Sequence, residues 1–323
     1  SLQNNTGNTD DTFVWCYPQK RMNPMEYPNL EQDFREIPES IVRSMATRLT
    51  DGLEKCGLYY RLFTRTKTAA STRAKLKAKN YQNGKRMQDL FGIRIAVYFQ
   101  DDQALCRRII EDRFSVVSIT EDRPDADTFS PTRLNFICKL PMSCRQELPS
   151  SIYDHYPIDT TVEIQLRTVF SEGWHEVEHD LRYKSKSDWD GSADLSRALN
   201  GIFATLISCD WSMLNIFDKL RDRKYREKDW TAMLKNKLRV HVEEQPLSHE
   251  LCTLLNQQPN LAAELYQIDR LLNFLSDGRF PGFLMTLDNL VFLTNALFMH
   301  NPEITAMTPP ELLASIDDCA RKR

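Results

Sequence analysis

The stretch VEIQLRTVFSEGWHEVEHDLRYK, from Val162 to Lys184, decides the fold expected for the rest of the chain. Apolar and polar side chains alternate over 162–166, which predicts a short strand, and an amphipathic helix follows from Arg167-Thr168. Helical spacing directs four apolar residues to the core: Phe170, Trp174, Val177 and Leu181. The opposite face carries His175, Glu178, His179 and Arg182. A strand bearing Glu163 and then such a face is typical of a pocket wall, although a solvated polar face has the same pattern.

Three more strands are expected upstream. DLFGIRIAVYF, from Asp89 to Phe99, is rich in Ile, Val and aromatic residues, and similar runs occupy 114–120 and 134–140. Helical or basic segments alternate with these strands. The pattern indicates an α/β (α+β) domain with one central mixed sheet flanked by helices.

A basic segment lies between the first expected helix, 40–56, and the first expected strand. It runs from Arg61 to Arg86 and includes Arg65, Lys67, Arg73, Lys75, Lys77, Lys79, Lys85 and Arg86. A charge run of this kind is often a solvated helix face. The alternative is a cradle in which Lys and Arg oppose the negative charges of a polyphosphate.

The chain divides into three parts. Residues 1–38 are expected to form a poorly structured arm, 39–190 the sheet domain, and 191–323 a helical domain without visible chemistry, joined by a polar linker at 185–192. A long helix opens the last part, with apolar residues at spacings of four and three: Leu195, Leu199, Ile202, Leu206, Cys209, Met213, Ile216 and Leu220. We expect this stripe to face the protein's own core rather than a dimer seam, although a homo-oligomer is compatible with the sequence.

Composition excludes several classes of protein. A net charge of −3 over 323 residues argues against a general nucleic-acid coat protein. Eight cysteines with no CxxC pair indicate reduced thiols, and with a polar N-terminus they favour a cytoplasmic protein. The most apolar stretch, 280–299, is broken by Pro281-Gly282 and carries Asp288, so we expect a buried helix and no membrane span.

The helix at 175–179 contains a formal HExxH zinc motif, His175-Glu176-Val177-Glu178-His179. In zinc proteases two such histidines bind the metal and the glutamate activates water. No GxxH follows His179, and the next glutamate is Glu227, beyond the linker. We therefore do not expect a metalloprotease.

Three motifs in order resemble the synthetase domain of the RelA/SpoT family, and most closely the small single-domain alarmone synthetases. The first, R-x-K-x-x-x-S-x-x-x-K, is Arg65, Lys67, Ser71 and Lys75. The second, D-x-x-G-x-R, is Asp89, Gly92 and Arg94. The third joins EIQLRT (163–168) to Trp174, Glu178-His179 and Tyr183-Lys184. The resemblance implies a nucleotidyltransferase-like mixed sheet and a nucleotide pyrophosphokinase similar to GTP diphosphokinases, with ATP as pyrophosphate donor and Mg²⁺ as cofactor.

The resemblance also implies a role for each site residue. Asp89 would coordinate Mg²⁺, and Glu163 would hold the metal or activate the acceptor hydroxyl. Arg65 and Arg94 would bracket the adenine. The phosphates would be held by Lys67, Ser71, Lys75 and Arg167. Supporting or acceptor-orienting roles fall to Gln165, His175, Glu178 and His179.

The acceptor loop departs from the family pattern. Relatives carry G-Y-x-S-x-H, whose tyrosine stacks on guanine, whereas this chain has SPTRLNFICKLP (130–141). Alignment puts Pro131 at the tyrosine, Arg133 at the serine and Asn135 at the histidine, and a shift of two puts Arg133 at the tyrosine. The acceptor therefore stays open between GDP or GTP, an adenine nucleotide and the tRNA 3′ end used by toxin relatives. A catalytically silent nucleotide-binding protein is a further alternative, against which the Asp89 and Glu163 pair argues.

Overall fold

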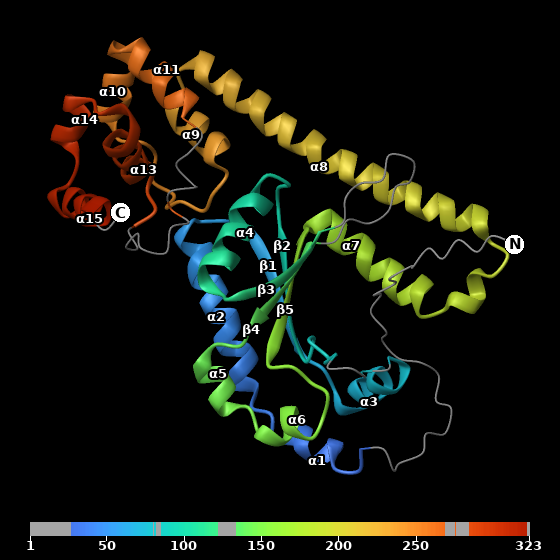
Figure 1. The fold of residues 1–323 in the computed structure, drawn as a ribbon. Helices are drawn as coiled ribbons and strands as arrows, with labels where there is room; N and C mark the ends of the chain where they lie inside the picture. Colours follow the sequence, from blue (N-terminus) through green and yellow to red (C-terminus); the bar gives the residue numbers. More distant parts are fainter. Residues whose placement is uncertain are drawn as a thin grey trace, which may run out of the picture.

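The computed structural model describes residues 27–79, 81, 85–121, 134–268, 275 and 284–321. Its centre is one five-stranded mixed sheet in the order β1-β2-β5-β4-β3 (Figure 1). Only β2 and β5 are parallel, and the other neighbours are antiparallel. The strands are β1 (Tyr60–Thr66), β2 (Phe91–Val97), β3 (Val116–Glu121), β4 (Leu134–Lys139) and β5 (Thr161–Thr168). The expected mixed sheet flanked by helices is confirmed.

One strand, β1, lies where the sequence suggests only a basic segment. It is an edge strand, paired on one side to β2. Because one side of an edge strand meets solvent, its sequence, YRLFTRT, carries charged residues among apolar ones and lacks the apolar run that marks β2. The remaining cations of this segment that lie at 69–78 form helix α3 (Ala69–Ala78).

Helices cover one face of the sheet. Apolar side chains of α2 (Glu39–Lys55) and α4 (Asp102–Arg113), such as Met45, Leu49 and Ile109, are buried in the core cluster with Ile95 and Ile164. Two short helices, α5 (Met142–Glu147) and α6 (Ser150–Asp154), follow β4. The other face of the sheet lies between α3 at one end and α7 (Val169–Val177) at the other (Figure 1).

Part of the range expected to be a poorly structured arm is helical. Residues 1–26 lie outside the described part of the chain, but Leu30–Arg35 forms helix α1, within the range assigned to an unstructured arm. Leu30 is fully buried in the core. Tyr156 donates a hydrogen bond of 2.6 Å to Asp33, which attaches α1 to the sheet domain.

The helix after β5 buries a different face from the one expected. Trp174 is buried, but Val177 is 49% and Leu181 65% exposed. The α-helix ends at Val177, and residues Glu178–Tyr183 continue as a π-helix. A π turn needs more residues per turn than an α turn, so the 3.6-residue period fails beyond Val177 and Leu181 rotates into solvent.

The rest of the described chain is helical, as expected, and begins with α8 (Ala193–Glu227), a helix of 35 residues that packs along α7 (Figure 1). A short 3-10 helix, Lys186–Trp189, precedes it. The helices that follow are α9 (Trp230–Leu238), α10 (His249–Gln257), α11 (Pro259–Gln267), α13 (Leu287–Thr294) with a π-helical end at Asn295–Met299, α14 (Pro302–Met307) and α15 (Pro310–Arg321).

The apolar stripe of α8 does not face the core as expected. Leu195, Ile202 and Ile216 are each more than half exposed, and the buried residues of the helix are Phe203 and Asp210. The packed face is therefore rotated away from the stripe. One cluster of buried apolar residues runs from Leu30 to Ile316 and includes both parts of the chain, so a boundary at 190 stays a prediction. Within the described residues, no helix is both long and apolar enough to span a membrane.

Candidate active site

Strand register brings the predicted site residues onto the uncovered face of the sheet. Arg65 of β1 lies opposite Gly92 of β2, which lies opposite Glu163 of β5. The next row on the same face contains Phe63, Arg94, Gln165 and Asn135. Since successive residues of a strand point to opposite faces, the residues between them, such as Ile164, are buried on the covered face. Three separate motifs of the sequence thus meet on one surface.

Asp89, just before β2, is held by two lysines. One of its carboxylate oxygens, Oδ2, lies 2.6 Å from Lys67 Nζ and 2.9 Å from Lys75 Nζ. Burial raises the pKa of Asp89, but the two ammonium groups outweigh it and lower the pKa to about 2. Burial in turn lowers the pKa of Lys67 to about 8. The motif R-x-K-x-x-x-S-x-x-x-K therefore supplies the counter-charges of the carboxylate in the second motif.

Glu163 has the opposite environment. It is 7% exposed, and its two oxygens accept hydrogen bonds from neutral amides, Asn135 at 3.3 Å and Gln165 at 3.2 Å. Burial, and after it the negative charge of Asp89, raise the pKa of Glu163 to about 7. Two neighbouring carboxyl groups therefore differ in proton affinity, which is the arrangement expected where one of them handles a proton.

Gly92 gives Arg65 its position. A methyl group at residue 92 would lie 2.9 Å from Nε of Arg65, closer than atoms in contact allow, so Arg65 lies flat across β2. Its guanidinium group feels the charges of Glu163 and Asp89, and burial lowers its pKa to about 10. The glycine of the second motif is thus needed for close approach of the arginine of the first.

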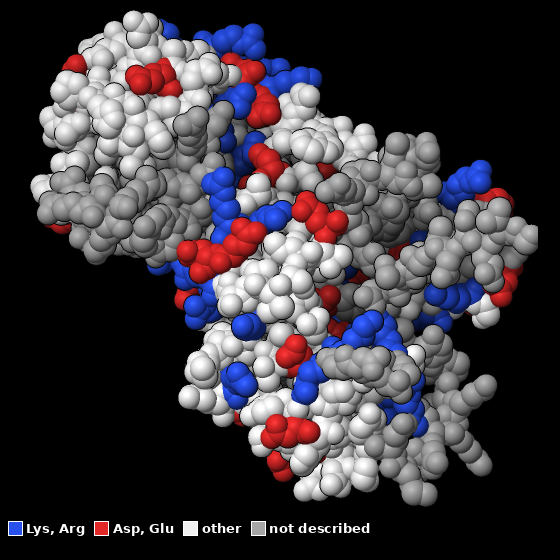
Figure 2. Space-filling model, in the orientation of Figure 1, with Lys and Arg blue, Asp and Glu red and all other residues white. Residues whose placement is uncertain are grey.

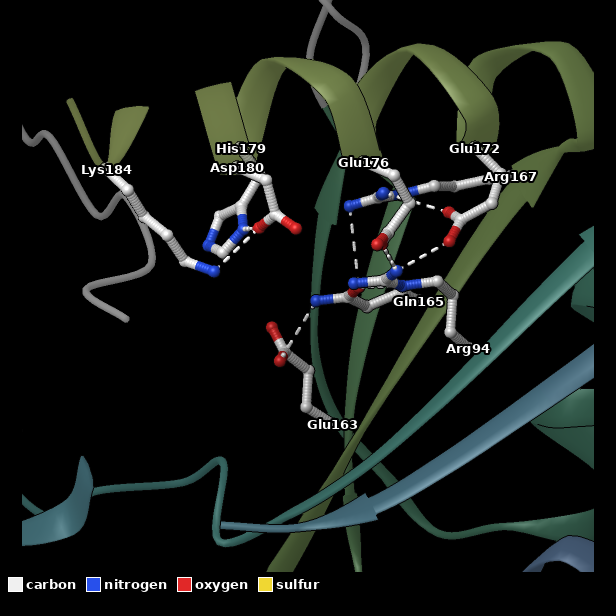
Figure 3. A network of polar contacts seen from close by, with 9 residues as sticks. All are labelled: Arg94, Glu163, Gln165, Arg167, Glu172, Glu176, His179, Asp180 and Lys184. Carbon is white, nitrogen blue, oxygen red and sulfur yellow. Dashed lines mark hydrogen bonds and ion pairs between the residues drawn. The ribbon is translucent and has the colours of Figure 1, made fainter. Parts of the chain in front are cut away.

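The other two arginines of the site are held by carboxylates of α7 (Figure 3). Arg94 contacts Glu172 at 2.5 Å and also pairs with Glu176, and its Nε donates to Gln165. Arg167 binds the other oxygen of Glu172 at 3.0 Å. Burial lowers the pKa of Arg94, but the two carboxylates outweigh it and raise the pKa overall. Sequence reasoning missed Glu172 and Glu176, although their spacing of four residues on a helix after Arg167 signals one shared face.

Near the end of this helix, the residues predicted to support the site lie on two different sides of the helix. Nδ1 of His179 donates a hydrogen bond of 2.9 Å to the carboxylate of Asp180, and Lys184 binds the same carboxylate at 2.7 Å. Figure 3 shows His179 and Lys184 on the side of the helix that faces Glu163. Within the described residues, the buried Nε2 of His179 has no hydrogen-bond partner. His179 thus joins the site.

His175 and Glu178 instead face α8. The ring of His175 lies 6.0 Å from that of Phe203, and Glu178 binds Arg182, which reaches Asn200. The expectation that these two residues lie on one face with His179 is wrong, because the helix changes from α to π winding after Val177; their supporting role in the site stays a prediction. The change in winding also separates the two histidines of the HExxH pattern.

Two predicted residues remain apart from these contacts. Ser71 lies in the first turn of α3, where its backbone N–H binds the N-cap hydroxyl of Thr68 at 3.2 Å. A helix N-terminus of this kind suits an anion, which agrees with the predicted phosphate role. Arg133, the proposed acceptor residue, lies outside the described residues.

Only part of the basic segment 61–86 forms an exposed basic surface, and this surface lies mainly over α3. Figure 2 shows Lys and Arg side chains gathered over this helix. Lys77 and Lys85 are exposed. Arg86 instead donates to backbone carbonyls, including that of Ile158 at 2.8 Å, so part of the basic segment stabilises a loop.

Comparison with known proteins finds one family model and several solved structures that are similar to part of this chain. Residues 64–188 match the family model described as "Region found in RelA / SpoT proteins". The small alarmone synthetase 1 from Bacillus subtilis aligns at 20% identity over 61% of this chain and 98% of that one, with a TM-score of 0.45. Its pppGpp-bound form aligns at 21% identity over 61% and 98%, with a TM-score of 0.43.

A GTP pyrophosphokinase family protein from Streptococcus pneumoniae aligns at 16% identity over 62% of this chain and 97% of that one, with a TM-score of 0.44. Structural likenesses of this size say nothing about substrate. No curated protein matches the chain in sequence. The family match covers the three motifs and the strands and helices that carry them. Residues 64–188 of the chain therefore match the region of RelA/SpoT proteins that the three motifs resemble.

Proposed function

We propose that this protein is an ATP-dependent pyrophosphokinase. It transfers the β,γ-pyrophosphate of ATP to a ribose hydroxyl of a nucleotide, either GDP or GTP or an adenine nucleotide. The observation that carries the proposal is the pair of buried carboxyl groups. Asp89 has a pKa of about 2 and stays ionised between two lysines, whereas Glu163 has a pKa of about 7. One carboxyl group suited to binding cations and one suited to a proton fit transfer to a hydroxyl group.

Asp89 also fits Mg²⁺, which proteins bind through one or two carboxylates together with water and phosphate oxygens. The second oxygen of Asp89, Oδ1, is buried and, within the described residues, has no hydrogen-bond partner. When bound, the ion would neutralise charge on the ATP phosphates. Lys67 and Lys75, which now neutralise Asp89, would be released toward those phosphates.

Glu163 is the residue that we assign to the proton. The acceptor hydroxyl oxygen forms a bond to the β-phosphorus of ATP, and the bond from that phosphorus to the α,β-bridging oxygen breaks, which releases AMP. The hydroxyl proton passes to Glu163. A base with a pKa near the working pH is half ionised there and still binds the proton well, so a value of about 7 suits this step.

The cations around the two carboxyl groups bind the donor. Lys67 is buried and Arg65 half-buried beside Asp89; Lys67 would meet the phosphates, and Arg65 would meet the adenine, as the resemblance implies. Arg94 and Arg167 are bound to Glu172, so contact with a nucleotide requires them to exchange that carboxylate for the ligand. His179 and Asn135 lie at the Glu163 side, where the acceptor must place its hydroxyl group.

Transfer of label from γ-labelled ATP tests the proposal. The protein is incubated with Mg²⁺, labelled ATP and, separately, GDP, GTP, ADP, unlabelled ATP or deacylated tRNA. We expect a labelled nucleotide product together with one equivalent of AMP. Label on tRNA would identify a toxin-type activity at the same site. ATP binding without transfer to any acceptor would contradict the proposal and favour a silent nucleotide-binding protein.

A further inference from the structure

Helix α8 carries a stripe of apolar side chains that the described part of its own chain does not bury. The eight members alternate at spacings of four and three residues, the heptad pattern of a coiled coil: Leu195, Leu199, Ile202, Leu206, Cys209, Met213, Ile216 and Leu220. Each is exposed or half-buried, and Ile202 and Ile216 are 54% and 64% exposed. Within the described residues, none of the eight belongs to the core cluster or packs against it. Figure 1 shows α8 along one edge of the molecule.

The helix is attached to its own chain through a different row of residues, spaced by seven. The ring centroid of Phe203 lies 4.8 Å from that of Trp174. Asp210 accepts a hydrogen bond of 2.7 Å from the hydroxyl of Thr168, and Phe217 contacts an aromatic ring of the sheet domain. At 3.6 residues per turn, this row is turned by about 70° from the centre of the stripe. One helix therefore presents one face to its own chain and a second, apolar face to solvent.

The stripe is symmetric about a midpoint between residues 207 and 208. In an antiparallel pair of α8 helices, each apolar residue of one helix therefore lies opposite an apolar residue of the second copy, and no position is left over. The four pairs, each formed twice, are Leu195 with Leu220, Leu199 with Ile216, Ile202 with Met213, and Leu206 with Cys209. Residues beside the stripe are small, namely Ala198, Thr205 and Ser212, which leaves room for a second helix at contact distance.

Charge decides the direction of such a pair. Three exposed carboxylates lie around the start of α8 and three exposed cations near its end: Asp188, Asp190 and Asp194, and Lys219, Arg223 and Arg226. Arg223 follows Ile216 by seven residues and so takes the next position of the stripe. In a parallel pair it would face Arg223 of the second copy. In an antiparallel pair it lies opposite residue 192, between Asp190 and Asp194, and opposite charges of this kind set the orientation of paired helices.

We propose that the stripe of α8 is a pairing surface for the same stripe of a second copy of this chain, in antiparallel orientation. The result is a homodimer with two-fold symmetry, in which one contact covers both stripes. The apolar residues of each helix pack between those of the other, and the acidic start of each α8 lies beside the basic end of its copy. The inference concerns assembly and does not depend on the function proposed above.

Light scattering of the intact protein over a concentration series tests the pairing. We expect a mass of twice the 37.7 kDa of one chain. Ile202→Glu and Ile216→Glu place a charge in the seam and should give monomers with unchanged helix content, because both positions are already exposed in the single chain. Trp211→Glu is the matched control: Trp211 is 55% exposed but lies on the opposite side of α8 from the stripe, so this variant should stay a dimer.

Disulfide linkage tests the direction, in a Cys209→Ser background that removes the cysteine of the stripe. The double variant Leu199→Cys/Ile216→Cys should link two chains on mild oxidation, and each single variant should link no more than the Cys209→Ser parent. Linkage of a single variant beyond the parent would overturn the antiparallel orientation. A wild-type monomer at every concentration would overturn the dimer and leave the stripe to another segment of the chain or a different partner. A dimer that persists in both glutamate variants would place the interface elsewhere.

Discussion

The two faces of the central sheet are built from alternate residues of the same strands, yet they differ in almost every physical property. The covered face consists of apolar side chains such as Ile95 and Ile164, which pack under α2 and α4. The uncovered face contains buried or half-buried ionisable groups whose pKa values are displaced in both directions. In β5, neighbouring residues therefore serve different ends: Ile164 contributes stability, and Glu163 is arranged for chemistry.

The difference between the two faces shows which part of the sheet offsets the free-energy cost of burying the ionisable groups of the site. Burying an ionisable group without a matching charge is unfavourable, and Glu163 is buried between neutral amides. Asp89 avoids most of this cost because two lysines contact it. The apolar packing on the other side of the same strands must therefore compensate for Glu163. Substitutions on the two faces should separate activity from stability.

The largest effect is expected for Glu163→Gln. Loss of a general base typically reduces rates by a hundredfold to ten-thousandfold, so we expect about a thousandfold lower transfer rate. ATP-analogue affinity should stay within a few-fold, because the amide fills the same space. The rate of AMP release and calorimetric binding measure the two quantities.

Glu121→Gln is the control for this change, because Glu121 ends the distant edge strand β3 and is exposed. It should retain normal turnover. Near-normal turnover of Glu163→Gln would show that the proton goes elsewhere.

Ile164→Ala tests the covered face. Its side chain is fully buried, and truncation of such a residue typically costs ~2–5 kcal/mol of unfolding free energy. Activity per folded molecule should change little, which urea unfolding and rate measurements on the same sample can establish. A large loss of turnover in a fully folded Ile164→Ala sample would mean that packing on the covered face determines the geometry of the site on the other face.

Asp102, at the start of α4, is a buried carboxyl group outside the site. Burial, and after it the charge of Asp101, raise its pKa to about 7 from the ordinary value of 3.8. A raised pKa means that ionisation destabilises the folded state: the penalty is absent below about pH 4, grows between pH 4 and 7, and is complete above 7. At 1.36 kcal/mol per pKa unit, Asp102→Asn should be more stable than wild type by up to about 4 kcal/mol at pH 8.

Thermal or urea unfolding at pH 4 and pH 8 provides the control for Asp102→Asn within one experiment. The gain should shrink toward zero at pH 4, where the wild-type carboxyl group is protonated. A gain of equal size at both pH values would assign the effect to packing instead of charge.

The smallest effect is expected for Glu172→Gln. Glu172 is buried and competes with a nucleotide for Arg94 and Arg167, but the amide oxygen of Gln can still accept a hydrogen bond, so the change should be about that of one hydrogen bond, ~0.5–1.5 kcal/mol. We therefore expect the non-hydrolysable analogue α,β-methylene ATP to bind up to about tenfold more tightly. Weaker binding would show that Glu172 positions the arginines for the ligand instead of restraining them.

Sequence reasoning predicted a feature correctly where the pattern of apolar residues and the chemistry of the side chains indicated the same structure. The apolar runs of β2 and β5 and the motif residues Asp89 and Glu163 were all predictable. The strand β1 was not, because edge position and function both place charges in it. The pairing of Arg94 with Glu172 depends on how α7 crosses the sheet, and residue spacing does not contain that angle. Whether the α8 stripe is buried likewise depends on tertiary packing, since a heptad pattern is the same for a core and for a free face.

Because Glu178–Tyr183 forms a π-helix, the number of residues in this segment affects which side chain faces Glu163. The hydrogen bonds of this segment span five residues, as in Lys184 N to His179 O at 3.2 Å, so it contains more residues than an α-helix of equal rise. A chain one residue shorter here can close an ordinary α turn and still fold. It would then present a different side chain to Glu163. Insertion and deletion, and not only substitution, are therefore routes by which relatives of this protein can change what the site accepts.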